Sequence, residues 1–158
     1  IALRAPMAGD LRDVVAALKI SGVVERIGDY AKNIAKRVPL IESAGRIEPL
    51  SLLPEMARMA SGMVHDVLDA FVERAAPAAI GVCERDEVVD DFYDSIFRAL
   101  LTHMMENPHN IGQSAHLLFV AKNLERVGDH ATNIAEMVYY AATGQHMSDR
   151  NSAGKRGR

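Results

Sequence analysis

The fold of this chain is decided by a stretch that occurs twice, first as ERIGDYAKNIAK at residues 25–36 and again as ERVGDHATNIAE at residues 125–136. Eight of the 12 positions are identical, and such a repetition indicates two structural units of one kind. In both copies apolar residues recur every three or four positions, which predicts the buried seam of packed helices. The two seams are Val24, Ile27, Ala31, Ile34 and Val38, and Leu124, Val127, Ala131, Ile134 and Val138.

The same spacing extends outward from the repeat and predicts four helices, over residues 10–37, 51–74, 77–105 and 112–143. Pro39 is expected to end the first helix, Pro77 to open the third, and Asn107 with Pro108 to close it. The second helix carries a stripe that is expected to fill the core, made of Met56, Met59, Met63, Val67 and Ala70. We therefore predict an all-α fold, an antiparallel helical bundle.

The composition is that of an ordinary soluble domain, because 49% of the 158 residues are apolar and 25% are charged. The net charge of -3 lacks the basic excess of nucleic-acid-binding proteins, so we expect no nucleic-acid partner. A single cysteine, Cys83, is typical of a reducing compartment, and no apolar run is long enough to span a bilayer. We therefore expect a cytoplasmic protein. The start at Ile1 has neither an initiator methionine nor a signal segment, and we expect it to be a cut end.

The repeat places two acidic side chains four residues apart in each copy, Glu25 with Asp29 and Glu125 with Asp129. This spacing puts each pair on one edge of its helix, where like charges cost about 0.2–0.5 kcal/mol. A neighbouring cation is therefore expected. Nearby arginine and lysine side chains could supply it as a solvated charge ladder, and a bound metal is the other interpretation.

The third helix favours the metal, since residues 84–94 hold six acids and one arginine. Its apolar seam of Val89, Tyr93, Ile96 and Leu100, extended backwards, reaches Asp86, so an acid stands where an apolar side chain would pack. Asp90 lies one turn further on. Asp86 could instead lie at a frayed helix start, where water satisfies an acid.

An Asp-x-x-x-Asp row facing a Glu-x-x-x-Asp row would bring four carboxylates together, which is costly unless a cation neutralises them. Oxygen ligands of this kind suit hard or borderline divalent ions and iron. His130, beside Asp129, could add a ligand, although a histidine next to a motif is more often a surface residue. Gly28 and Gly128 lie inside helices, where close helix contact is the expected reason.

The doubled string, with the Asp-x-x-x-Asp row on the helix before it, closely resembles the PhoU family of phosphate-transport regulators. The stretch from His65 to Phe71 is also similar to that family, and the resemblance covers about residues 6 to 146. It implies a repeat of three-helix bundles whose first bundle is incomplete here. Residues 1–40 would be the last helix of the first repeat and residues 49–143 the second repeat. Residues 144–158 have no apolar period and are rich in small and basic residues, so we expect them to form a disordered tail.

The resemblance also implies a function and a site. The protein would be a negative regulator of phosphate uptake and of phosphate-starvation signalling, acting between the ATPase subunit of a phosphate ABC transporter and a sensor histidine kinase. It would be a homodimer in the cytoplasm, peripheral to the inner membrane through its partners. Its cofactor would be a divalent or multinuclear metal, iron first, with zinc, manganese, magnesium or nickel as alternatives. Asp86, Asp90, Glu125 and Asp129 would form the complete site, and Glu25 and Asp29 half of another.

Two further classes of protein stay open at this point. A carboxylate-bridged di-iron enzyme would need Glu-x-x-His pairs that project into a bundle, and the only such pair, Glu106 with His109, contains Pro108. The other alternative is a metal-free helical adaptor whose acids are all solvated. We expect no catalytic residues, because the chain shows no nucleophile beside a base and no Gly-rich phosphate loop.

Overall fold

The structure is a computed structural model that describes residues 8–42 and 51–148. Within these ranges five α-helices and one short 3-10 helix follow one another, and there is no strand. The elements are α1 (Ala8–Ala35), α2 (Val38–Glu42), α3 (Leu53–Glu73), α4 (Ala76–Glu106), η2 (Pro108–Asn110) and α5 (Ile111–Thr143). The predicted all-α bundle is therefore confirmed.

Most helix ends fall where the sequence places them. Pro54 and Pro77 lie in the first turns of α3 and α4, where a missing N–H breaks no helical hydrogen bond. The N–H of Gly144 bonds to Tyr140 O at 2.8 Å in a left-handed C-cap that closes α5. One boundary differs: α1 ends at Ala35, before Pro39, and Pro39 lies inside the short helix α2. The expected disorder of the tail falls largely on residues 149–158, outside the described residues.

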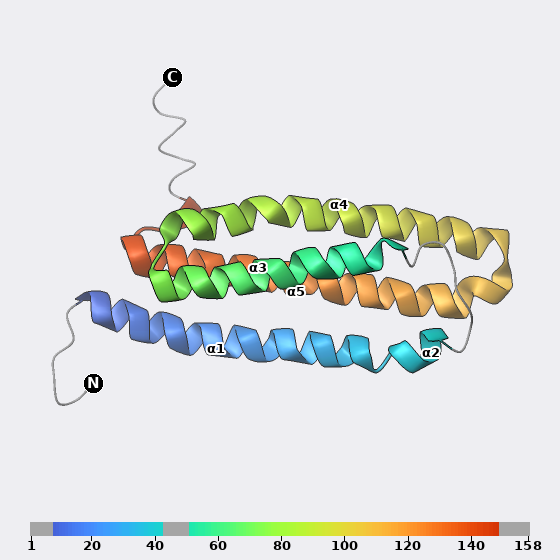
Figure 1. Cartoon of the computed structure of the whole chain (residues 1–158), viewed down its shortest axis with the longest axis horizontal. Helices are drawn as coiled ribbons and strands as arrows, with labels where there is room; N and C mark the ends of the chain where they lie inside the picture. The colour runs from blue at the N-terminus through green and yellow to red at the C-terminus, as the bar shows by residue number, and fades with distance from the viewer. Residues whose placement is uncertain (1–7, 43–50, 149–158) are drawn as a thin grey trace, which may run out of the picture.

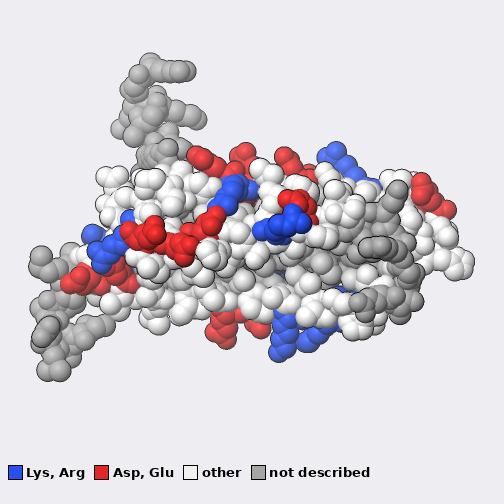
Figure 2. Space-filling view, viewed as in Figure 1, with Lys and Arg blue, Asp and Glu red and all other residues white. Residues whose placement is uncertain are grey.

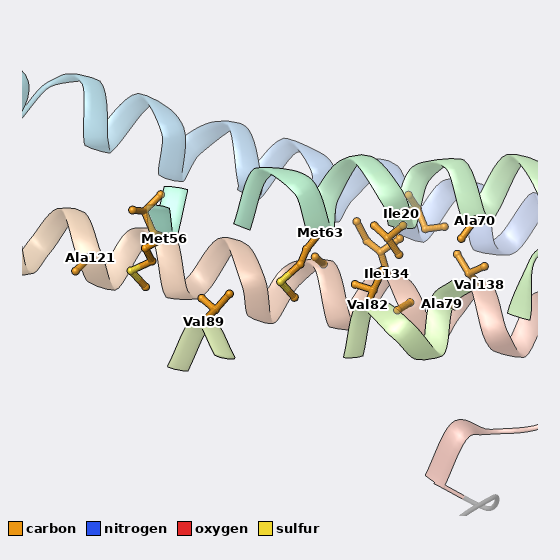
Figure 3. Packing of buried hydrophobic residues seen from close by; sticks show 14 of the residues in the cluster. Ile20, Met56, Met63, Ala70, Ala79, Val82, Val89, Ala121, Ile134 and Val138 are labelled. Atoms are coloured by element: carbon orange, nitrogen blue, oxygen red, sulfur yellow. The ribbon is translucent and has the colours of Figure 1, made fainter. Parts of the chain in front are cut away.

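Helix α5 is the centre of the bundle, with α3 and α4 packed along it and α1 on the opposite side (Figure 1). Its predicted seam is confirmed, because Leu124, Val127, Ala131, Ile134 and Val138 are all buried. Met63 of α3, Val82 of α4 and Ile134 of α5 point into one interior (Figure 3). The methionine stripe on α3 is core filling as predicted, with Met59 only partly buried.

The predicted seam on α1 is confirmed only in part. Ile27 and Ile34 pack against the core, but Val24, Ala31 and Val38 are exposed. The face that α1 turns to α5 is completed instead by Ala16, Ile20 and Val23. The reason is that α1 packs mainly on α5, so a single stripe is covered and the rest of its apolar surface stays open, including Leu18 at 74% exposed. None of the helices in the described ranges has the length and apolar character to cross a membrane.

Candidate metal centre

The predicted carboxylates come together where α4 packs against α5. Asp86 and Asp90 lie one turn apart on α4, and Glu125 and Asp129 lie one turn apart on α5. We call these four residues the acidic cluster. The pKa of Asp86 is raised to about 6, by burial first and then by the charges of Asp90, Asp129 and Glu125, in that order of size. Each of the three other carboxylates is thus close enough to act on Asp86.

The pKa of Asp90, one turn further along α4, is also raised. Its pKa is raised by burial first, then by Glu125 and Asp129, and a nearby lysine opposes the shift. That lysine is Lys122, which forms an ion pair with Glu125 and lies 4.8 Å from the ring of Tyr93. Its contact with Glu125 raises the pKa of Lys122. One cation therefore faces four carboxylates, and the cluster keeps an excess of negative charge.

Gly128 explains how α5 comes so close to Asp86. A Cβ on this glycine would lie 3.0 Å from Asp86 Oδ1 and 3.4 Å from Val89 Cγ1. Asp86 Oδ1 itself is buried and has no hydrogen-bond partner among the described residues. A buried carboxylate oxygen without a donor is costly, and a cation is one partner that would satisfy it. The residues present therefore fit a cation, although within the described ranges no three His, Cys, Asp or Glu side chains already stand in a metal-binding arrangement.

The first copy of the motif has a different environment. Glu25 and Asp29 are exposed on α1 and do not contribute to the shifted pKa values of Asp86 or Asp90. A Cβ on Gly28 would meet nothing within 4 Å in the described structure. The prediction of a close helix contact at Gly28 is therefore wrong. The structure thus brings together four of the six predicted site residues and leaves the other two in the open.

His130 does not join the acidic cluster. Its Nδ1 donates to Arg126 O at 2.9 Å, and its ring meets Tyr30 of α1 edge-on, with centroids 5.1 Å apart. Tyr30 and His130 occupy the same position in the two copies of the repeat. The idea of His130 as an added ligand is therefore unsupported, because the side chain is used in the contact between α1 and α5.

Two features near the cluster were not foreseen from the sequence. Burial raises the pKa of Cys83 to about 11, with smaller contributions from Glu136, Asp86 and Glu84, so this thiol is a poor nucleophile.

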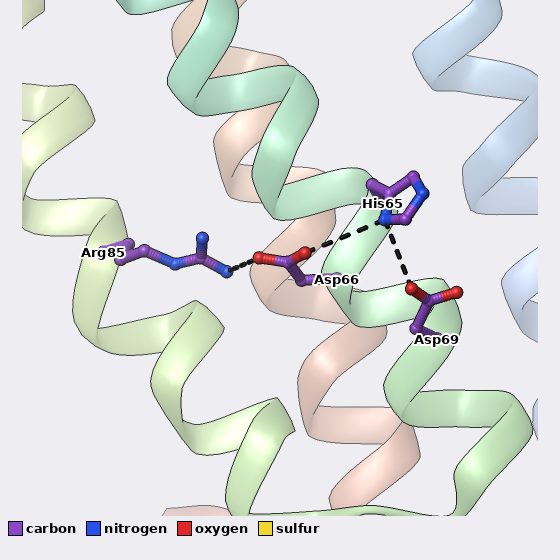
Figure 4. Close-up of polar contacts among 4 residues, drawn as sticks. All are labelled: His65, Asp66, Asp69 and Arg85. Atoms are coloured by element: carbon purple, nitrogen blue, oxygen red, sulfur yellow. Dashed lines mark ion pairs between the residues drawn. The ribbon is translucent and has the colours of Figure 1, made fainter.

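The second feature is a polar network on the outer face, where His65 contacts Asp66 and Asp69 on α3 and Arg85 of α4 pairs with Asp66 at 2.7 Å (Figure 4). The periodicity of α3 shows only that these side chains point outward.

Figure 2 shows acidic side chains gathered along the exposed side of α3, where Asp66, Asp69 and Glu73 line a shallow groove with Arg85. The groove lies on the surface of the bundle and contains no residue of the acidic cluster. Its arginine pairs with Asp66, one of the three carboxylates that line the groove.

Comparison with known proteins agrees with this architecture. The PhoU domain family matches residues 1–38 and 53–138. A phosphate-specific transport system accessory protein PhoU homolog from Zymomonas mobilis is 58% identical over 150 residues, which cover 95% of this chain and 63% of that protein. A homolog of the same name from Caulobacter vibrioides is 52% identical over 149 residues, which cover 94% of this chain and 65% of that protein. The chain thus spans somewhat less than two thirds of the length of these relatives.

Solved structures give the same result. The crystal structure of PhoU from Pseudomonas aeruginosa superposes with a TM-score of 0.85 at 36% identity, over 91% of this chain and 69% of that one. The phosphate transport system regulatory protein PhoU from Streptococcus pneumoniae superposes with a TM-score of 0.81 at 29% identity, over 90% and 67% of the two chains. The doubled helix motif, the bundle around α5 and these matches together show that the chain belongs to the PhoU domain family.

Proposed function

We propose that this protein is a non-catalytic accessory protein of phosphate transport that represses phosphate uptake and the phosphate-starvation response, and that it binds metal at the acidic cluster. The observation that carries the metal proposal is the buried, unpartnered Oδ1 of Asp86 amid three further carboxylates and a single lysine. The regulatory part is supported by relatives named as accessory proteins of the phosphate-specific transport system. Its proposed partners are the transporter's ATPase subunit and a sensor histidine kinase.

Asp86, Asp90, Glu125 and Asp129 would hold the ion. All four offer carboxylate oxygens, which suit iron, manganese, magnesium or zinc. A bound divalent cation would neutralise the excess charge of the cluster and favour the ionised form of Asp86. Asp90 and Asp129 are exposed, so their side chains have room to adjust to the ion. Glu25 and Asp29 would form a second site only with carboxylates from outside the described residues.

The metal proposal is tested by elemental analysis of protein purified without chelator. The wild-type chain should carry metal, and the Asp90→Ala and Asp129→Ala double variant should lose it while keeping its helix content by circular dichroism. A matched control removes two exposed acids of α4 that lie outside the cluster, Glu87→Ala with Asp91→Ala, and should keep the metal.

Stoichiometric metal in the Asp90 and Asp129 double variant would refute the site. If the wild-type protein carries no metal and its melting temperature is unchanged by iron, zinc or manganese, the metal-free adaptor is the better description.

The regulatory proposal is tested in the cell. Deletion of the gene should leave phosphate-starvation genes active in high phosphate, and the wild-type gene should restore repression. Normal repression in the deletion strain would contradict the proposed role, whatever the metal content of the protein.

A further inference from the structure

A second candidate site lies between the N-terminal half of α1 and the C-terminal end of α5, away from the acidic cluster. It is a pocket of about 460 Å³ with apolar walls that include Leu11, Val15 and Met137. Arg12 and Lys19 of α1 also line it. We call it the junction pocket. Its volume falls within the roughly 300–1,000 Å³ of small-molecule sites, and it contains none of the four residues of the acidic cluster.

The internal repeat allows this junction to be compared with the opposite end of the same helix pair, which is filled. There the Arg37 guanidinium lies 3.9 Å from the centre of the Phe119 ring and bonds to His116 Nδ1 at 2.8 Å. Because the two copies of the repeat are offset by 100 residues, each of these three residues has a counterpart at the open end.

The counterparts are smaller or differently shaped. Arg37 corresponds to Met137, Phe119 to Lys19 and His116 to Ala16. The junction pocket thus has Ala16 and Lys19 at the positions where the other junction has His116 and Phe119. Two ends that are equivalent in the repeat have become different, one packed and one hollow.

The groups around the junction pocket indicate what it would bind. Arg12 Nε is buried and meets no hydrogen-bond acceptor in the described part of the chain. The arginine lies against the end of α5, since a Cβ on Gly144 would be 3.6 Å from Arg12 Nη1. Lys19 is exposed and makes no ion pair with a described residue. These two cations outnumber the one carboxylate of the lining, Glu136.

An aromatic pair completes the rim. Tyr140 and His146 stack with their ring centroids 4.9 Å apart and their planes at 23°, and both line the pocket. Stacked rings present a flat, apolar edge to a ligand. A buried guanidinium donor without an acceptor, a free lysine and apolar walls together match a ligand that has an apolar body and one anionic group.

We propose that the junction pocket binds a small organic anion, with an apolar aromatic or short aliphatic body between α1 and α5 and its carboxylate, sulfonate or phosphate group at Arg12 and Lys19. The site is independent of metal binding. Because the pocket is lined by both α1 and α5, its ligand would also fix how α1 lies on α5.

The test uses the full chain and 8-anilinonaphthalene-1-sulfonate, an aromatic anion whose fluorescence rises on transfer to an apolar site. We expect saturable binding of one probe per chain. Val15→Trp should fill the pocket and weaken binding about tenfold or more, whereas Leu18→Trp adds the same ring to α1 outside the pocket and should leave it unchanged.

The anionic group is tested separately. Arg12→Gln should weaken binding of the sulfonate about tenfold, the scale of a charge-assisted hydrogen bond, and Arg98→Gln, which removes an exposed arginine of α4, should not. The neutral analogue N-phenyl-1-naphthylamine should bind the Arg12 variant and the wild type alike. Circular dichroism checks that each variant keeps its helix content.

Equal losses in a variant and its matched control, or no loss in Val15→Trp and Arg12→Gln, would overturn the proposal. The location of the bound probe can also be tested without variants. In amide NMR spectra of the wild-type chain, the probe should shift resonances around Lys19, Met137 and Tyr140. Shifts confined to α3 and α4 would place the probe elsewhere and exclude the junction pocket.

Discussion

The two glycines of the repeat give the sharpest test of the helix packing, because one sequence motif places them in opposite environments. Gly28→Ala adds a methyl group that meets nothing within 4 Å, so only the helix propensity changes. We expect this variant to be more stable by up to about 1 kcal/mol. Gly128→Ala gains the same propensity but places its methyl group 3.0 Å from Asp86 Oδ1 and 3.4 Å from Val89 Cγ1.

Overpacking of this kind costs about 1–3 kcal/mol, because α4 has to move or Asp86 has to change its rotamer. The propensity gain cancels in the comparison, so the difference in unfolding free energy between the two variants should be about 1–3 kcal/mol. For a chain of this size each kcal/mol corresponds to roughly 2–4 °C in melting temperature. Urea denaturation followed by circular dichroism measures the difference. If the two variants are stabilised equally, α5 does not pack on Asp86 as described.

Three further predictions concern single residues. Because the folded-state pKa of Asp86, about 6, lies above its ordinary value of 3.8, ionisation of Asp86 opposes folding, and its unfavourable contribution should fade as the pH falls through 6. Asp86→Asn should therefore stabilise the metal-free protein at pH 7. The gain should be only about 1 kcal/mol, because solvent screens this partly exposed group. Urea denaturation in chelator measures it, and a difference in unfolding free energy from wild type that is the same at pH 5 and pH 8 would contradict the prediction. With its pKa raised from 9.0 to about 11, Cys83 should react with a thiol reagent at pH 8 about a hundredfold more slowly in the folded chain than in denaturant, and equal rates would be inconsistent with its burial. Met63→Ala should cost about 2–5 kcal/mol in urea denaturation because Met63 is buried at 1% exposure, and a cost below about 1 kcal/mol would show that the cavity collapses.

The acidic cluster shows how far sequence reasoning reached toward the site. Asp86 stands at an apolar position of its helix, and this pattern favoured a carboxylate at the contact with the neighbouring helix over an acid at a frayed helix start. The structure agrees, because its Oδ1 is buried. The role of Lys122 as counter-charge depends on which way a long side chain turns, and periodicity does not determine that.

The repeat led to a partly wrong prediction of which face of α1 is buried. Identical motifs predicted identical seams, yet a helix buries the stripe that its neighbours cover. Helix α5 is covered by α1, α3 and α4, whereas α1 packs mainly on α5. Val24 and Ala31 are therefore exposed on α1, while their counterparts Leu124 and Ala131 are buried on α5.

The sequence by itself determined the four long helices, most of their ends and the presence of acidic rows, because these depend on local spacing, proline positions and capping that a single segment contains. Only the tertiary structure decided which acidic row meets a second one and which remains open. It also decided that His130 faces Tyr30, and that the junction at Arg12 is hollow while the one at Arg37 is filled. These outcomes depend on the packing of segments far apart in the chain, where the same side chain is buried or exposed according to its neighbours.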